Sequence, residues 1–208
     1  MSEPEQDGGA RGMAEGVDGR VGAVFSTDLP AVNRQPARVP GGVGAVFSTD
    51  LSAVNRQLGR VPRGVAAVAH RCACGLPDVL RTKPRLPDGT PFPTTYYATC
   101  PRLTGAISTL ESSGMMAEMT DRLQGDTALA NAYASAHQDY LSRRLELGQV
   151  AEIEGISAGG MPTRVKCLHV LVAHALAVGP GVNPLGDEAL EALGSWWAAG
   201  PCVPRVEP

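Results

Sequence analysis

The chain has 208 residues, of which 43% are hydrophobic, 4% aromatic and 19% charged, and its formal net charge is −3. This length and hydrophobic content allow one domain with a sizeable core. The small negative charge gives no general attraction to nucleic acid or to an anionic membrane surface. The longest apolar run, residues 170–178, is far shorter than a membrane span and is interrupted by His174.

The first residues and the cysteine count predict a cytoplasmic protein. The segment Met1–Asp7 lacks the basic and apolar regions of a secretory signal. The chain has 5 cysteines, an odd number, and this count without an export signal favours reduced thiols over a disulfide framework. We therefore expect the thiols to serve a metal.

A tandem duplication with a period of 22 residues follows a polar N-terminal segment. Residues 1–21 have almost no large apolar side chain and are expected to be disordered. The repeat copies, residues 22–43 and 44–65, differ at four positions. The second copy predicts a short helix over residues 50–57 that ends at Gly59, whereas Pro36 breaks the same helix in the first copy.

These features predict the domain boundaries. We expect residues 1–43 to form a disordered tail with the duplicated segment, residues 44–202 one domain, and residues 203–208 a second tail. The duplicated segment also allows a weaker interpretation, in which it is a bivalent peptide ligand.

Three short stretches rich in β-branched or aromatic residues predict strands over residues 65–71, 79–85 and 94–99. Turn sequences separate them, so we expect an antiparallel meander.

Helical patterns take over after residue 100. Leu103, Ile107 and Leu110 form a stripe that Gly114 ends, and a methionine-rich turn is expected at residues 115–119. Further helices are predicted from Asp126 to residue 148, from Pro162 to about residue 178, and from about residue 187. The helix from Pro162 is apolar on every side and is expected to be buried. The predicted fold class is α+β, with a small antiparallel sheet of about three strands packed against four to six helices and stapled by a metal.

The cysteines give the most specific chemical prediction. Zinc prefers a tetrahedron of thiolates and imidazoles. We expect Cys72 and Cys74 to reach one ion from a tight turn, Cys100 from the end of the third strand, and Cys167 from the start of the buried helix, with His169 as the alternative fourth ligand. Zinc is the first choice, and an iron–sulfur cluster is the alternative.

Each of these residues also has an ordinary interpretation. A buried cysteine often acts as a small hydrophobic side chain, which fits Cys167 best and fits a turn at Cys72 and Cys74 least well. Cys202 is expected to be a thiol without a role. His174 is expected to be a core histidine and His137 a surface residue, although a Cys–His nucleophile pair of Cys167 with His169 or His174 stays open.

A second candidate site is a pocket for anions. Gly160, Arg164 and Lys166 lie around the predicted start of the buried helix, where backbone amides and cations attract a negative charge. The alternative is a glycine-rich connector without a ligand.

The chain resembles a bacterial family, best known from actinobacteria, called domain of unknown function 501. The similarity covers about residues 50–202. Its segments are VAHRCACGLP (68–77), PFPTTYYATCP (91–101), GGMPTRVKCLH (159–169), VAHAL (172–176) and NPLG (183–186). The resemblance implies a cytoplasmic bacterial protein and supplies no activity. The extra copy of the repeat departs from the family pattern, because members carry one.

The sequence therefore predicts a binding or regulatory protein with a structural zinc site and a protein partner. The alternative is a metal-dependent enzyme that acts on a phosphorylated or other anionic small molecule, using Arg164 and Lys166. Neither a membrane nor a nucleic acid is an expected partner.

Overall fold

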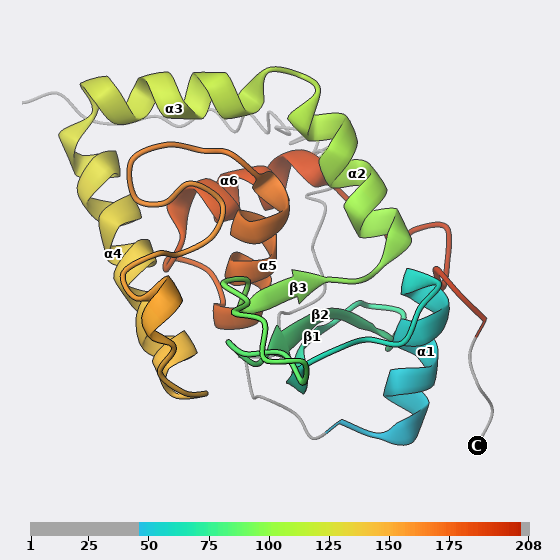
Figure 1. Ribbon diagram of the computed structural model, residues 1–208. Helices are drawn as coiled ribbons and strands as arrows, with labels where there is room; N and C mark the ends of the chain where they lie inside the picture. The colour runs from blue at the N-terminus through green and yellow to red at the C-terminus, as the bar shows by residue number, and fades with distance from the viewer. Residues whose placement is uncertain (1–45, 205–208) are drawn as a thin grey trace, which may run out of the picture. The chain divides into compact units, whose positions relative to one another are not determined.

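A computed structural model describes residues 46–204, all within one compact unit (Figure 1). The predictions for residues 1–43 lie outside these residues. The elements in chain order are α1 (Ser48–Leu58), β1 (Val65–Arg71), β2 (Pro77–Thr82), β3 (Tyr96–Ala98), α2 (Pro101–Glu111), α3 (Met115–Gly125), α4 (Thr127–Leu145), the 3₁₀ helix η1 (Ala151–Ile153), α5 (Leu168–Val178) and α6 (Pro184–Leu193).

The three strands form one antiparallel sheet in the order β1-β2-β3, which confirms the predicted meander and the α+β class. Val68 pairs with Leu80, and Leu80 pairs with Tyr97 on the other side. A tight turn joins β1 to β2, with Gly75 at φ +85°. That conformation favours glycine because it has no Cβ.

The two faces of the sheet are covered by different helices. Successive residues of a strand point to opposite faces, and in β2 Leu80 packs with Val54 of α1, whereas Val79 belongs to the large core that contains α5. In Figure 1, α1 lies beside one end of the sheet, while α5 lies behind β3 among the remaining helices. The sheet is therefore a middle layer between a small core and a large one.

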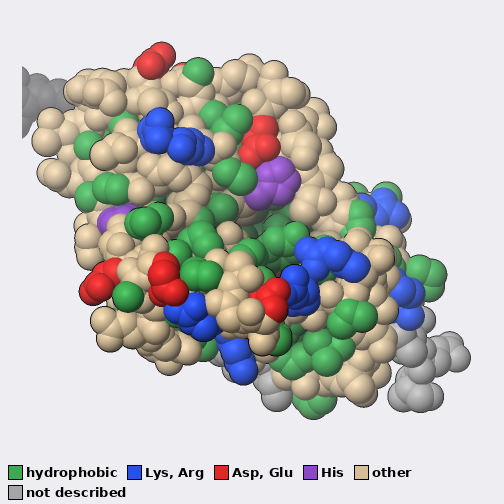
Figure 2. Space-filling model, viewed as in Figure 1, with side chains coloured by type: hydrophobic (Ala, Val, Ile, Leu, Met, Phe, Trp, Pro, Cys, Tyr) green, Lys and Arg blue, Asp and Glu red, His purple; other side chains and the backbone are tan. Residues whose placement is uncertain are grey.

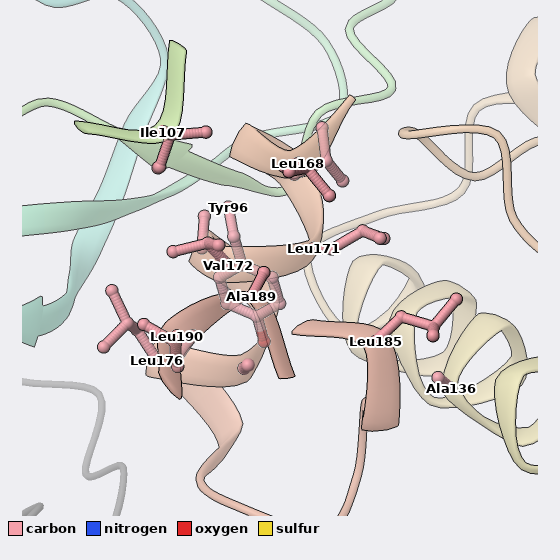
Figure 3. Packing of buried hydrophobic residues seen from close by; sticks show 14 of the residues in the cluster. Tyr96, Ile107, Ala136, Leu168, Leu171, Val172, Leu176, Leu185, Ala189 and Leu190 are labelled. Carbon is pink, nitrogen blue, oxygen red and sulfur yellow. The ribbon is translucent and has the colours of Figure 1, made fainter. Parts of the chain in front are cut away.

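Helix α5 is the centre of the large core. Nine of its eleven residues are buried, as the predicted all-round apolar pattern requires. Figure 3 shows Leu168, Leu171, Val172 and Leu176 projecting from it on several sides, toward β3 and the side chains of α6. Burial of this kind is the main source of stability in a domain of this size.

The structure differs from the predicted helices at two places. The methionine-rich segment is not a turn but helix α3, in which Met119 and Leu123 are buried four residues apart. Helix α5 begins at Leu168 rather than at Pro162. The backbone amides of Val165 and Lys166 donate instead to Thr120 Oγ1 and Gly159 O, so they are not available for an earlier helical turn.

The capping signals are largely confirmed. Asp126 caps α4 by accepting from the Leu129 amide at 2.9 Å, and Gly59 ends α1 at φ +66°. Asn183 caps α6 and accepts from the Gly186 amide at 3.0 Å, so this helix starts three residues earlier than expected. Within residues 46–204, no helix combines the length and the apolar character that crossing a membrane requires.

Replacing Gly186 by alanine is expected to destabilise the fold by about 1–3 kcal/mol, because extra atoms in a packed core cause strain. A Cβ at Gly186 would lie 2.4 Å from the Leu171 carbonyl oxygen and 3.0 Å from Ala175 Cβ. Urea unfolding would measure the change. Gly105→Ala is the matched control, since its Cβ meets nothing within 4 Å and it should stabilise the protein slightly. Equal effects of the two changes would contradict this description of the α5–α6 contact.

The contact between Asp50 and Arg71 is expected to make the folded protein less stable in acid. Its carboxylate accepts from Arg71 at 2.7 and 2.8 Å, and these hydrogen bonds are the main cause of a lowered pKa for Asp50. The pKa of this carboxyl is lower in the folded protein than in the unfolded chain, so its ionisation stabilises the fold at pH values above the pKa of the unfolded chain. This stabilisation is lost as the pH falls through the pKa of the folded protein. Asp50→Asn should cost about 1–3 kcal/mol at pH 7, and the difference from the parent should shrink below about pH 4.

Chemical denaturation from pH 7 to pH 2 would measure this difference. The control is Asp88→Asn, because Asp88 also pairs with an arginine but lies at the surface, with a side chain that is 49% exposed. Exposed pairs contribute little. A gap between Asp50→Asn and the parent that does not narrow in acid would contradict the prediction.

Candidate functional site

The five cysteines fall into three separate neighbourhoods of the described structure. Cys72 contacts Cys74, Cys100 contacts Cys202, and Cys167 contacts His169. The structure thus does not bring together the predicted set of Cys72, Cys74, Cys100 and Cys167. Among residues 46–204, one group of three or more potential ligands has all its ligand atoms within 4.8 Å of one another: Glu111, Cys167 and His169.

Cys100 and Cys202 join the end of the sheet to the C-terminal segment. Cys100 is buried in the large core, and this burial raises the pKa of its thiol to about 12. The Gln57 amide donates to Cys202 Sγ at 3.3 Å and to the Pro77 carbonyl oxygen at 2.8 Å. Cys202, predicted to have no role, therefore packs against the fold.

The turn between β1 and β2 holds Cys72 and Cys74. The Gly75 amide donates to the Cys72 carbonyl oxygen at 2.7 Å, which closes the turn. Cys72 is buried, and desolvation raises the pKa of its thiol to about 12. The fully buried Asp78 lies nearby. Its Oδ1 is 2.7 Å from His70 Nδ1, and its Oδ2 has no hydrogen-bond partner among the described residues.

The group of Glu111, Cys167 and His169 is built where two helices meet. Glu111 is the last residue of α2, and Cys167 is the N-cap of α5. The Leu168 amide donates to Glu111 Oε1 at 2.7 Å, so the carboxylate satisfies one of the unpaired amides at the start of a buried helix. This bond fixes the position of the carboxylate.

The same carboxylate oxygen also holds the histidine. His169 Nδ1 is 3.1 Å from Glu111 Oε1. A hydrogen bond with Cys167 and the one with Glu111 raise the pKa of His169 to about 9, with burial opposing them. All three side chains are partly exposed. The arrangement is therefore a preformed triad of sulfur, nitrogen and oxygen at the protein surface.

The spacing of the triad fits the coordination of one ion. Two nitrogen or oxygen ligands, each about 2.0–2.1 Å from a tetrahedral zinc, lie about 3.3 Å apart. The observed distance between His169 Nδ1 and Glu111 Oε1 is 3.1 Å. A zinc–sulfur bond of about 2.3 Å places the third ligand only slightly farther away.

The predicted anion-binding residues lie in the segment that leads to this triad. Arg164 and Lys166 are exposed, and neither forms an ion pair with a residue in the range 46–204. At Gly160, a Cβ would lie 2.6 Å from the Arg164 carbonyl oxygen and 3.0 Å from the Lys166 amide nitrogen. The segment folds tightly on itself, and only glycine fits there. Figure 2 shows a histidine beside acidic side chains, with basic side chains on the same face.

The other histidines are engaged elsewhere. His174 is fully buried, as predicted for a core histidine. Its Nε2 lies 2.9 Å from Asp139 Oδ2 and its Nδ1 lies 3.3 Å from the Asn183 amide nitrogen. His137 was expected at the surface, but it is buried against Ser157.

Glu111 is the site residue that the sequence prediction missed. It follows an amphipathic stripe and looks like a surface residue of the same helix. One signal was present: a carboxylate in the last helical turn is unfavourable beside the negative end of the helix dipole. An acidic residue at that position often has another partner, here the start of α5.

Comparison with known proteins gives a family but no activity. Neither a curated protein nor a solved structure matches the chain. The model of one family, described as a protein of unknown function (DUF501), matches residues 68–191. This range includes the β1–β2 turn and all three residues of the triad. Because it is more than half of the sequence, the chain belongs to the DUF501 family.

Proposed function

We propose that the protein binds a divalent transition metal, zinc first, at Glu111, Cys167 and His169, and acts on an anionic small molecule there. The distance of 3.1 Å between His169 Nδ1 and Glu111 Oε1, with the Cys167 thiol adjacent, is the observation that carries this proposal. A mixed set of sulfur, nitrogen and oxygen ligands suits zinc better than magnesium or calcium.

The number of ligands favours a catalytic site over a structural one. Structural zinc sites usually have four protein ligands, whereas catalytic sites have three and leave a position for water or substrate. No fourth cysteine, histidine, aspartate or glutamate joins the triad within residues 46–204. The partial exposure of its members leaves the fourth position open to solvent. The geometry therefore supports the metal-dependent enzyme over the closed structural site.

The surrounding residues support an anionic ligand. Arg164 and Lys166 precede Cys167 closely in the chain, and their charges are not neutralised by an ion pair within the described residues. When bound, zinc would supply a Lewis acid and an activated water. In this proposal Arg164 and Lys166 bind the negative charge of the substrate, and Glu111, Cys167 and His169 hold the ion. The cytoplasm is the compartment in which the thiols would stay reduced.

The same geometry supports a second candidate, a metal-free thiol nucleophile. The specific observation is that the Cys167 side chain hydrogen-bonds His169, which Glu111 holds in turn. A nucleophile, a base and an orienting carboxylate are the parts of a catalytic triad. This candidate predicts fast alkylation of Cys167 by iodoacetamide in metal-free protein and no protection of Cys167 by zinc.

Removal of one ligand is expected to weaken zinc binding by about a hundredfold or more, since even outer-shell changes cost about 10- to 100-fold. The variants are Cys167→Ser, His169→Gln and Glu111→Gln, with titration calorimetry as the measurement. Cys202→Ser is the matched control and should keep the parent affinity. The cobalt form should show a thiolate charge-transfer band from a single sulfur.

Two results would contradict the metal proposal. One is the absence of stoichiometric zinc binding to the parent protein. The other is loss of binding in Cys100→Ser while Cys167→Ser binds normally, because that pattern would return the metal to the site first predicted from the sequence.

Anion binding gives a separate expectation. The zinc-loaded protein should bind inorganic phosphate, and the double change Arg164→Ala with Lys166→Ala should weaken this binding by about tenfold or more, because two charge-assisted contacts are lost. Lys83→Ala, which removes an exposed lysine from the segment after β2, is the control. Equal phosphate affinity in the double variant and the parent would show that the two cations do not serve the site.

A further inference from the structure

The turn between β1 and β2 holds two sulfurs that are close enough to react with each other. Residues two apart have Cα atoms roughly 5–7 Å apart from chain geometry alone, which overlaps the range of disulfides. The Cys72 sulfur contacts both the backbone amide and the side chain of Cys74. The hydrogen bond from the Gly75 amide to the Cys72 carbonyl oxygen, at 2.7 Å, holds the turn in this form.

The two thiols differ in their access to solvent. Cys72 is only 5% exposed, whereas Cys74 is half-buried. A reagent from solution therefore reaches Cys74 first, and Cys72 reacts only with a partner already attached to Cys74. Dithiol redox centres have this division between an attacking and a resolving cysteine.

A buried carboxylate lies at the start of the strand that follows the turn. Asp78 is fully buried, and its Oδ2 has no hydrogen-bond partner among the described residues, although a buried unpaired oxygen is costly. The turn brings the two residues near each other, because the Cys72 amide donates to the Leu76 carbonyl oxygen at 2.9 Å and Arg71 pairs with Pro77, and the charge of Asp78 adds to the raised pKa of Cys72. Its other oxygen lies 2.7 Å from Nδ1 of His70, whose side chain is 16% exposed.

We propose that Cys72 and Cys74 form a reversible disulfide and that the turn is a dithiol–disulfide exchange centre for small-molecule or protein disulfides. Asp78 accepts the proton of Cys72, and His70 connects Asp78 to the solvent. This role gives a reason for the unpaired buried oxygen, which the metal site does not use.

The exchange proceeds in two balanced steps. The Cys74 thiolate attacks a substrate disulfide, so that a bond forms between Cys74 Sγ and one substrate sulfur while the other leaves as a thiolate and takes up a proton. Cys72 then gives its proton to Asp78 and attacks Cys74 Sγ, releasing the second substrate thiol, which is protonated in turn. The two cysteines lose two electrons, and the substrate disulfide gains them. A second dithiol reverses the sequence.

Oxidised glutathione is a direct probe of this reaction. Trypsin cleaves after Arg71 and Arg81 and releases a peptide that contains Cys72 and Cys74 and no other cysteine. After incubation of the full chain with oxidised glutathione, mass spectrometry of this peptide should show the loss of two hydrogen atoms and no attached glutathione. Dithiothreitol should restore the original mass.

Two variants separate the steps. Cys72→Ser should accumulate a stable mixed disulfide between glutathione and Cys74, because no resolving thiol is present. Asp78→Asn keeps both thiols, and it should slow the release of glutathione from Cys74 by about tenfold or more, since positioned bases contribute at least this much. Asp88→Asn, which changes an exposed carboxylate, should not slow it.

The proposal is overturned if the peptide of the parent protein stays reduced in excess oxidised glutathione, or if Cys74 keeps its glutathione in the parent. It is also overturned if Asp78→Asn and Asp88→Asn resolve at the same rate. If Cys72→Ser does not fold, the measurement on the parent protein is by itself a sufficient test of the proposal. None of these results depends on zinc, so they are independent of the proposed metal site.

Discussion

The buried N-terminal end of helix α5 is the constraint on which this structure depends. Nine of its eleven residues are buried, and a buried helix start leaves backbone amides without water. An amide without a partner in the core costs about 1–3 kcal/mol. Glu111 removes part of this cost by accepting from the Leu168 amide at 2.7 Å. The partner comes from the end of another helix, so the packing of α2 against α5 and the capping of α5 are one interaction.

The same interaction produces the candidate site. Because Glu111 is fixed by the Leu168 amide, its Oε1 also has a fixed position for His169 Nδ1. Cys167 and His169 lie on either side of Leu168 at the first turn of a helix that cannot move without disturbing the core. A site on a rigid element needs little rearrangement to bind its ligand. The fold therefore supplies preorganisation, which a surface cluster of the same residues on a loop would lack.

The periodic features of the sequence predicted most of the fold. The meander and the buried helix followed from local patterns, and Asp126 was recognised as a cap because side-chain capping is a short-range effect. The start of α5 was placed six residues too early, because its true position depends on tertiary partners. Thr120 and Gly159 take the amides that a helix from Pro162 would have used.

The composition of the site was harder to predict for a related reason. The spacing of cysteines along the chain does not show in which direction each sulfur points from a turn or a helix cap. Cys100 packs in the large core next to Cys202, whereas Cys72 lies against Cys74 in the turn. Cys167 and His169 were named as candidates, but the third member, Glu111, is 56 residues earlier in the sequence. Only the packing of α2 on α5 brings it there.

The two sulfur sites differ in the group that faces each thiol, and this difference separates their chemistry. At Cys167 the neighbours are an imidazole and a carboxylate whose separation matches that of two ligands on one metal ion. A cation can therefore replace the proton between them. At Cys72 the neighbours are a second thiol and a buried carboxylate that lacks a partner on one oxygen. No third ligand atom completes a metal group there within residues 46–204. Two adjacent thiols with a proton acceptor inside the protein suit thiol–disulfide exchange better than metal coordination. The proposed metal site and the proposed redox site therefore share no cysteine.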